Sequence, residues 1–400
     1  MSHYDARETR SADERAAAQL AELRKQLAQV TGPAEVDPAE IGSLADLARL
    51  PVLRKADLAR RQREKPPFGG IRASNVTHMF QSPGPIYEPG NVGRDFWRLG
   101  RFLHAAGIGT TDVVQNCFGY HLTPAGHMFE AGARAVGCVT IPAGTGQTDL
   151  QVRAAADLGA TAYAGTPDYL KVILDRADEM GERLGIRRAA VSGGALFPSL
   201  RAEYAARGIS CLQCYATADL GLIAYEAPDP ADPTAAPEGM IVDEDVIVEI
   251  VRPGTGDPVP VGDVGEVVVT ALNPDYPLVR FATGDLSAML EGAAPSGHTA
   301  PRIRGWMGRA DQTTKIKGMF VRPEQVAELV ARHPEIEAAR VVADRAGERD
   351  VMTVQVVAAD GDAGAWAESV AQVLKLRGTV ERVDALPNDG LVIEDRRDYG

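Results

Sequence analysis

The chain has 400 residues, of which 45% are hydrophobic and 24% charged, and its formal net charge is −13. This length allows a large buried core and two or three domains, while the acidic balance argues against a nucleic-acid partner, which would call for a basic surface. No uncharged apolar run reaches about 18 residues, so no membrane span is expected. Residues 1–20 are charged and lack an apolar signal core, which predicts a cytoplasmic protein.

Helices and strands are predicted to alternate along the first part of the chain. A surface helix is expected in 1–30, a short helix near 56–64, a short strand at 76–80 and a helical segment from about 91. Helical spacing of apolar residues then predicts helices at 93–108, 125–137, 150–159 and 168–185. Strands are predicted between them at 112–118, 138–143, 161–165 and 187–191, the second as a buried strand. This alternation predicts a parallel sheet with helical crossovers.

The predicted secondary structure changes after residue 237 from alternating helices and strands to strands alone. Residues 240–272 contain two strand runs separated by Gly, Pro and Asp turns, which predicts antiparallel β structure. From about residue 311 the order is a hairpin, a helix, two strands, a helix and a strand, typical of a small α+β domain. The predicted fold class is therefore α/β, with a large N-terminal domain of mixed sheets and helices (1–307) and a small α+β C-terminal domain (308–400).

The four cysteines do not predict a metal centre. Cys211 and Cys214 have the spacing of half a zinc site, but no second pair or His-x-x-His partner accompanies them. They lie in a strand-like run, where residues three apart face opposite sides of a sheet. Buried thiols are the favoured interpretation.

Several polar or glycine-rich segments lie at the ends of predicted strands, where ligands bind in parallel α/β sheets, and one further segment bridges to the C-terminal domain. They are GTPDYL (165–170), SGGALFP (192–198), CYATADLG (214–221), RFATGDL (280–286) and GRADQTTKIKG (308–318). In this order and spacing they resemble the adenylate-forming (AMP-binding) enzymes, specifically the phenylacetate–coenzyme A ligase branch. The resemblance runs from about residue 70 to 345, and residues 308–400 fit the mobile C-terminal lid domain of that family.

The resemblance implies an acyl-activating enzyme. Such enzymes join a carboxylate, here small or aromatic, to coenzyme A through an acyl-adenylate, using ATP, which leaves as AMP, and Mg²⁺. The partners implied are a small-molecule carboxylate or acyl thioester and coenzyme A. A homodimer is a common assembly in this family.

The resemblance also assigns residues to the nucleoside. Asp285 corresponds to the acid that accepts hydrogen bonds from both ribose hydroxyls, a task suited to a bidentate acceptor. Arg309 is expected to reach the ribose and assist catalysis, and Asp311 matches the hinge of the lid. A turn-capping role for Asp285 and a surface role for Arg309 are the simpler alternatives.

The adenine is expected to lie between a tyrosine and a glycine-rich turn. Tyr215 is assigned to stack on the base, with Ala216 beside it. The backbone around Gly193, Gly194 and Ala195 is assigned to read the edge of the base. Ordinary core packing is the alternative for Tyr215.

A further segment, CFGYHLTPAG (117–126), corresponds to part of the acyl pocket in this branch. Tyr120 is retained, whereas His121 and Thr123 replace small or aromatic apolar groups. Since a buried polar side chain needs a partner, these residues favour a smaller or more polar carboxylate than phenylacetate. Solvent contact is an equal alternative for His121. Thr166 is expected to shape the pocket or to cap the next helix.

The phosphate loop departs from the family pattern. The family sequence is Ser-Ser-Gly-Thr-Thr-Gly-Lys-Pro, and here the corresponding run keeps Ser82, Gly84 and the terminal proline. Two further prolines in the run have no N–H to donate. Glu88 lies at or beside the lysine position, and a reversed charge facing a triphosphate costs about 4 kcal/mol at 4 Å and an effective dielectric of 20.

Two other family residues are altered. Asp219 replaces the glutamate that holds Mg²⁺ and is one methylene shorter, although it retains the carboxylate that the ion requires. Leu391 follows Gly390 where the family has the lysine used in adenylation, and Arg396 or Arg397 could substitute only with a shift in register.

Two alternatives to a ligase with a rebuilt phosphate grip therefore stay open. One is an enzyme of the same fold that does not use ATP and transfers acyl from a preformed adenylate or thioester. The other is a non-catalytic homologue that binds nucleotide or acyl groups. Retention of the ribose acid, adenine tyrosine and hinge argues against simple decay of the site.

Overall fold

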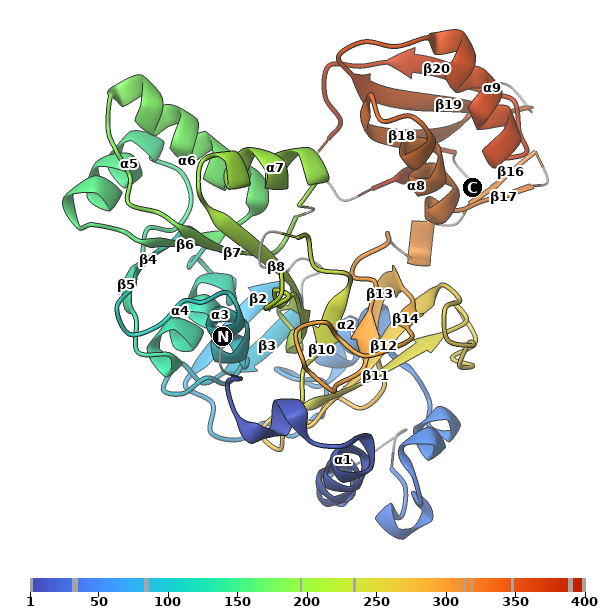
Figure 1. Cartoon of the computed structure of the whole chain (residues 1–400). Helices are drawn as coiled ribbons and strands as arrows, with labels where there is room; N and C mark the ends of the chain where they lie inside the picture. Colours follow the sequence, from blue (N-terminus) through green and yellow to red (C-terminus); the bar gives the residue numbers. More distant parts are fainter. Residues whose placement is uncertain are drawn as a thin grey trace. The chain divides into compact units, whose positions relative to one another are not determined.

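The computed structural model describes residues 3–30, 35–82, 86–194, 196–232, 235–308, 310–312, 314–317, 319–346, 349–387 and 391–397 (Figure 1). The chain forms two compact units: an N-terminal unit of Met1–Thr283 and Ala288–Gly305, and a C-terminal unit of Gly284–Ser287 and Trp306–Gly400. None of the helices in this described part of the chain has the length and apolarity needed to cross a membrane.

A nine-stranded mixed sheet forms the centre of the N-terminal unit. Its strands are β4 Val113–Asn116, β5 Val139–Ile141, β6 Ala162–Gly165, β7 Arg188–Val191, β8 Ser210–Thr217, β9 Gly221–Tyr225, β10 Met240–Val242, β14 Met289–Leu290 and β15 Arg302–Ile303. The order is β14-β15-β10-β9-β8-β7-β6-β4-β5. The strands from β8 to β5 pair in parallel, which confirms the predicted crossovers, and the others pair antiparallel.

Both faces of the parallel half of this sheet are covered by helices. The helices are α3 Leu99–Ala105, α4 Ala125–Ala135, α5 Thr148–Asp157, α6 Pro167–Met180 and α7 Pro198–Ala206. Along β6, Ala164 packs with α3 and α4, whereas Tyr163 packs with α5, α6 and α7, and Figure 1 shows the latter three grouped on one side of the sheet. Cys214 and Cys211 belong to these two cores respectively, as their spacing predicts.

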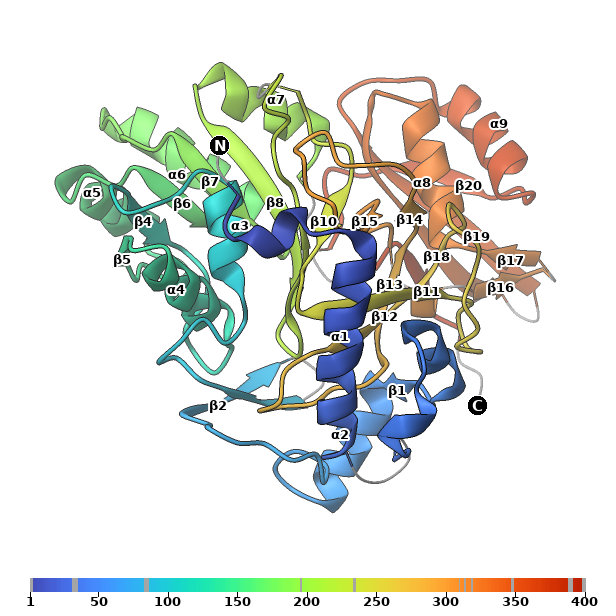
Figure 2. The ribbon, with the colours of Figure 1, turned by 60° about the horizontal axis from the view of Figure 1, so that its bottom comes forward.

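A second sheet holds the start of the chain in place. It has the order β1-β13-β12-β11, with β1 Leu53–Arg54, β11 Val246–Val251, β12 Gly265–Ala271 and β13 Phe281–Ser287. Helix α1 (Ala12–Leu27) lies beside β11 and β12 (Figure 2), where Gln19 Nε2 donates to the carbonyl oxygens of Glu244 and Val246 at 3.1 and 3.2 Å. Short 3-10 turns occupy Ala6–Thr9, Pro38–Glu40 and Leu44–Arg49.

Residues 55–90 form a helix and a hairpin, and the predicted phosphate loop lies in this hairpin. Helix α2 (Lys55–Glu64) follows β1 directly, and β2 (His78–Ser82) forms a hairpin with β3 (Ile86–Gly90). Gln62 of α2 clamps β3, since its Nε2 donates to the Tyr87 carbonyl at 2.7 Å and its Oε1 accepts from the Tyr87 N–H at 2.8 Å. Helix α2 and this hairpin are therefore fixed to each other.

The C-terminal unit has the predicted α+β order. Its elements are a 3-10 turn Ala310–Gln312, β16 Thr314–Ile316, β17 Met319–Val321, α8 Pro323–Arg332, β18 Ile336–Ala346, β19 Arg349–Ala358, α9 Ala363–Val373, β20 Thr379–Arg382 and β21 Ile393–Asp395. The main sheet has the order β20-β19-β18-β21. Trp366 of α9 is 1% exposed and packs in the core of this unit.

Two local expectations are wrong. The strand predicted as buried is β5, which lies at the sheet edge, and Val139 is 62% exposed. The helix expected from 93 begins only at Leu99. Asp95 caps its first turn by accepting from the N–H groups of Leu99 and Gly100 at 3.0 and 2.8 Å, and Arg98 before it has φ +66.

Candidate functional site

The carboxyl ends of parallel strands bring predicted site residues together at one edge of the large sheet. Phe118, Thr166 and Gly193 follow β4, β6 and β7. A Cβ atom placed on Gly193 would lie 3.8 Å from Thr166 Cγ2 and 3.9 Å from Phe118 Cε1. Gly193 has φ +71, which favours glycine, and the backbone at Gly193 and Gly194 is exposed. The turn can therefore present main-chain groups to a ligand.

Tyr120 packs beside this edge against α4. Asn116 Nδ2 donates to the Tyr120 hydroxyl at 2.8 Å, and a Cβ on Gly126 would come within 2.7 Å of the tyrosine ring. Burial raises the pKa of Tyr120, so its phenol is neutral. Thr123 is half-buried near it, whereas His121 is exposed, consistent with the solvent-contact alternative for that histidine.

Three other predicted site residues, Thr166, Tyr215 and Ala216, lie in the N-terminal unit. Thr166 occupies the N-cap position of α6, but its side chain makes no capping hydrogen bond, so shaping of the pocket is the interpretation left for it. Tyr215 is 8% exposed and belongs to the core that includes Ile86 of β3 and Tyr276. Ala216, half-buried, follows it at an irregularity in the pairing of β8 with β9. Adenine stacking by Tyr215 stays a prediction.

Glu88 is turned into the protein beneath the β2–β3 hairpin. It lies opposite Phe80 in the strand register and is 1% exposed. Ser82 Oγ donates a hydrogen bond to Glu88 Oε1 at 2.5 Å. The glutamate predicted to lie at or beside the lysine position is thus buried and hydrogen-bonded within the N-terminal unit.

Asp219 and Lys55 complete this environment. Lys55 Nζ lies 3.0 Å from Asp219 Oδ2, and the side chains of the two residues are 35% and 0% exposed. The Lys55 ammonium is thus the partner of Asp219 Oδ2, and Tyr276, which is 2% exposed, lies in the same core as Tyr215. We refer to Lys55, Ser82, Glu88, Asp219 and Tyr276 as the carboxylate cluster.

The electrostatics of the carboxylate cluster favour a protonated Glu88. Burial and then the negative charge of Asp219 raise the pKa of Glu88 to about 8, although the hydrogen bond from Ser82 and the charge of Lys55 act in the opposite direction. Burial also raises the pKa of Tyr276, with Asp219 and then Glu88 contributing, which places its hydroxyl in the field of both carboxyl groups. Near neutral pH, one ammonium thus balances one carboxylate.

Asp285 is buried in the C-terminal unit. Trp306 Nε1 donates to its Oδ1 at 3.1 Å, and the Leu286 N–H donates to the Gly308 carbonyl at 2.8 Å. The Asp285 carboxylate therefore accepts a side-chain hydrogen bond from Trp306, in addition to any role in capping its own turn. Ribose binding by Asp285 stays a prediction.

The structure leaves several predicted positions undescribed. Gly84, Ala195 and Arg309 lie outside the described residues, as does Gly390. The backbone of Asp311 lies in the turn Ala310–Gln312, but its side chain is outside the described part.

The two candidate substitutes for the C-terminal lysine form ion pairs within their unit. Arg396 Nε lies 2.8 Å from Glu394 Oε1. Arg397 is 7% exposed and lies 2.8 Å from Asp350 and 2.6 Å from Asp395. Arg397 thus joins β19 to β21, whereas Arg396 pairs with β21 alone.

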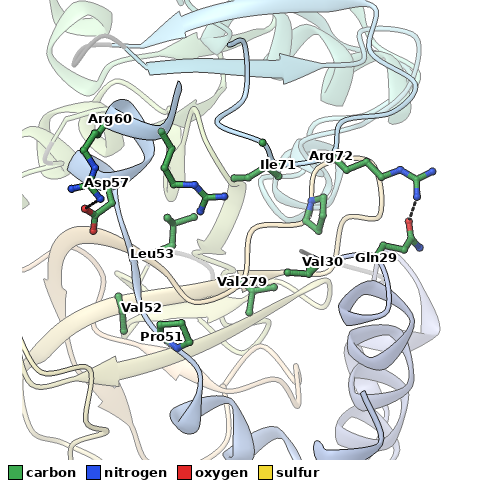
Figure 3. A pocket seen from close by; sticks show the side chains of 13 residues that line it. Gln29, Val30, Pro51, Val52, Leu53, Asp57, Arg60, Ile71, Arg72 and Val279 are labelled. Atoms are coloured by element: carbon green, nitrogen blue, oxygen red, sulfur yellow. Dashed lines mark hydrogen bonds and ion pairs between the residues drawn. The ribbon is translucent and has the colours of Figure 1, made fainter. Parts of the chain in front are cut away.

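A cavity of about 190 Å³ lies elsewhere in the N-terminal unit (Figure 3). Arg60 pairs with Asp57 at one end at 3.0 Å, and Arg72 donates to Gln29 at the other end at 3.0 Å. Leu53 and other apolar residues lie between them. None of the predicted site residues lines this cavity.

Comparison with known proteins identifies the class and then the branch. The family model described as AMP-binding enzyme matches residues 97–273, so the parallel sheet and its carboxyl edge belong to the AMP-binding class. A phenylacetate–coenzyme A ligase from Aromatoleum evansii is 30% identical over 338 residues, covering 80% of this chain and 74% of the relative. One from Thermus thermophilus is 30% identical over 319 residues, covering 76% and 70%. The chain belongs to the phenylacetate–coenzyme A ligase family of adenylate-forming enzymes.

Solved structures agree with the fold. A 2-hydroxyisobutyryl-CoA ligase in the postadenylation state with 2-HIB-AMP has a TM-score of 0.80 and 24% identity, with 99% of this chain and 94% of that chain covered. An open form of a 2-hydroxyisobutyryl-CoA ligase with 2-HIB-AMP and CoA has a TM-score of 0.76 at 24% identity, covering 100% and 96%. The predicted adenylate-forming fold is confirmed.

Sequence reasoning missed Lys55 and Tyr276. Neither lies in a segment that carries the family resemblance by spacing, and Lys55 reaches Asp219 only through a tertiary contact. The available signal for Lys55 was its position directly before the helix predicted near 56–64. For Tyr276 no local pattern distinguishes it from an ordinary core aromatic.

Proposed function

We propose that this chain is an acyl-activating enzyme that joins a small or aromatic carboxylate to coenzyme A through an acyl-adenylate formed from ATP. Family membership supports the reaction class. The single observation that carries ATP use is the Lys55 ammonium beside Asp219, because it supplies a positive charge that acts on Glu88, the residue at or beside the position of the missing lysine.

The buried environment of Glu88 also removes the main objection to ATP. An ionised glutamate beside a triphosphate would repel it by several kcal/mol, on the order of the 4 kcal/mol for a charge pair at 4 Å. Because the pKa of Glu88 is raised to about 8, the side chain is mostly neutral near pH 7. The charge reversal seen in the sequence is thus largely cancelled.

In the N-terminal unit, one set of residues would bind the acyl group and another would bind the nucleotide. Tyr120, packed on Gly126, forms a wall for the acyl group, with Thr123 and Thr166 as small polar neighbours. This wall supports a small or polar acid as substrate. The turn at Gly193 and Gly194 offers backbone groups to the adenine.

The metal and the lid are part of the same proposal. Asp219, which faces Lys55 through Oδ2 and keeps the carboxylate that a hard cation requires, would hold Mg²⁺, which would neutralise phosphate charge. Asp285 would accept from the ribose hydroxyls, and the C-terminal unit would act as a lid hinged near Asp311. The contact of Arg309 with the ribose stays a prediction from the sequence. A homodimer and a cytoplasmic location are also predictions from the sequence.

Pyrophosphate release by the purified protein with ATP, Mg²⁺ and a panel of small and aromatic carboxylates tests this function. We expect release that depends on the acid, and a coenzyme A thioester detected by mass spectrometry when coenzyme A is added. A matched reaction without the acid is the control. No release with any acid, alongside measurable AMP or coenzyme A binding, would instead favour acyl transfer without ATP. No binding of either ligand would leave a non-catalytic homologue.

A further inference from the structure

We propose that the cavity shown in Figure 3 binds a small organic anion, namely a carboxylate or a phosphate monoester carried on an aromatic ring or a branched apolar chain. All of the residues that line this cavity belong to the N-terminal unit. None of the described residues assigned above to the nucleotide or the acyl group is among them. The proposal therefore concerns a second site and does not rest on the proposed function.

The lining of the cavity carries an excess of positive charge. It contains three arginines, Arg60, Arg61 and Arg72. Among the described residues that line it, Asp57 is the only acid, and this carboxylate lies 3.0 Å from Arg60 Nη2. Arg72 Nη1 donates to the amide oxygen of Gln29 at 3.0 Å, and an amide carries no charge. The charges of Arg61 and Arg72 are thus not balanced within the lining, although the whole chain has a net charge of −13.

Arg61 is held in position by the turn that follows α2. Its Nε donates to the Gly69 carbonyl at 3.1 Å, and a Cβ on Gly69 would lie only 2.9 Å from Arg61 Cβ, so the turn packs closely on the helix. The two terminal nitrogens of this half-buried side chain form no hydrogen bond among the described residues. A guanidinium group matches a carboxylate or phosphate with two parallel donors. Because Arg61 is already anchored, binding costs less side-chain entropy.

The size and the apolar part of the lining define the body of the ligand. Apolar side chains lie between the two charged ends of the cavity: Val30, Pro51, Val52, Leu53, Ile71 and Val279 (Figure 3). The cavity volume is about 190 Å³. An apolar cavity of about 150 Å³ accommodates a benzene ring, whereas pockets for larger ligands begin at about 300 Å³. The cavity therefore suits one ring or one branched chain with an anionic head group, and a whole nucleotide or coenzyme A does not fit.

Helix α2 connects this cavity to the carboxylate cluster. Arg61 lines the cavity, whereas Lys55 of the same helix pairs with Asp219 at 3.0 Å and Gln62 holds Tyr87 of the hairpin. A ligand that binds the folded state alone stabilises that state. An anion bound by Arg61 therefore stabilises the unit that contains α2, and thermal unfolding reports its binding.

The test is calorimetric titration and thermal unfolding of the full chain, without ATP or coenzyme A, in the presence of phenylacetate, phenyl phosphate or the neutral phenylacetamide. We expect at least one of the two anions to bind and to raise the melting temperature, and phenylacetamide to bind at least about tenfold more weakly because it lacks the charge. Arg61→Gln should weaken anion binding by about tenfold or more. Arg72→Gln should weaken it by a smaller factor, because Arg72 is exposed. Arg63→Gln, at an exposed position of α2 outside the lining, is the matched control and should bind like the wild type.

Binding of phenylacetate alone or of phenyl phosphate alone would sustain the proposal and identify the head group. No binding of either anion, equal binding of phenylacetamide, or unchanged anion affinity in Arg61→Gln and Arg72→Gln would overturn it. Circular dichroism establishes that each variant is folded, and Arg61→Lys, which keeps the charge without the planar fork, gives a second measure at the same position and should weaken binding less than Arg61→Gln. Because the titration contains no ATP, binding that depends on Arg61 in a protein without acid-dependent pyrophosphate release would sustain this site and refute the proposed function.

Discussion

Lys55 and Asp219 form an ion pair with 3.0 Å between Nζ and Oδ2, in which the carboxylate is fully buried and the lysine is about one-third exposed. Lys55 begins α2, and Asp219 follows β8 of the large sheet. The pair therefore joins α2, to which the β2–β3 hairpin is hydrogen-bonded, to the predicted metal ligand after β8.

Replacing Lys55 by methionine should weaken both stability and turnover. Removing one partner of a buried pair costs about 3–5 kcal/mol, and the exposure of Lys55 reduces this to about 1–3 kcal/mol. Urea unfolding measures the change, and acid-dependent pyrophosphate release should fall at least about tenfold, since a phosphate-facing charge is worth 1.4 kcal/mol or more. Lys25→Met, on exposed α1, is the control and should change neither. Unchanged turnover in a folded Lys55→Met variant would refute a phosphate role for this lysine.

The stability of the N-terminal unit should fall as pH rises, because of Glu88. Its pKa is about 8 when folded and 4.5 ordinarily, so between these values the folded state holds a proton that the unfolded chain releases. This contribution is present below about pH 4.5 and is lost as pH rises through 8. Unfolding free energies measured near pH 6 and pH 9 should differ more in the wild type than in Glu88→Gln, which cannot ionise. An identical pH dependence in the two proteins would contradict a buried, protonated Glu88.

A side chain at Gly126 should disturb the proposed acyl wall. In Gly126→Ala the new Cβ would meet the Tyr120 ring at 2.7 Å, so the ring must move. Overpacking of this kind costs about 1–3 kcal/mol, and we expect a raised KM for the carboxylate with a smaller change in KM for ATP. Gly109→Ala is the matched control, because a Cβ there meets nothing within 4 Å. A lower melting temperature with unaltered KM for every acid would separate Tyr120 from substrate binding.

Nucleotide affinity should depend on the charge of Asp285. Asp285→Asn keeps an acceptor for Trp306 Nε1 but loses the bidentate carboxylate. Hydrogen bonds to charged groups are worth about 1.5–3 kcal/mol, so AMP binding measured by calorimetry should weaken by about 10- to 100-fold. Asp263→Asn, at an exposed turn, should bind AMP normally. Full AMP affinity in Asp285→Asn would leave the carboxylate with a structural role, such as its contact with Trp306.

Local patterns in the sequence were enough for most elements and for the family. The apolar spacing of residues 168–185 predicted α6, and a run of alternating helices and strands predicted parallel pairing, because side-chain periodicity reports burial directly. The limit of this reasoning is visible at β5, whose composition resembles a buried strand although its place at the sheet edge exposes Val139. Strand order depends on distant pairing, which periodicity does not encode.

The site was decided partly by sequence and partly by tertiary structure. Motif order alone placed Thr166, Gly193 and Tyr120 at strand ends, and the parallel sheet brings such ends to one edge. The protonation state of Glu88 could be inferred only from the fold. The sequence shows a charge reversal, whereas the structure shows a buried acid whose pKa is raised by burial and by Asp219. A protonation state depends on burial and neighbouring charge, and both come from residues far apart in the chain.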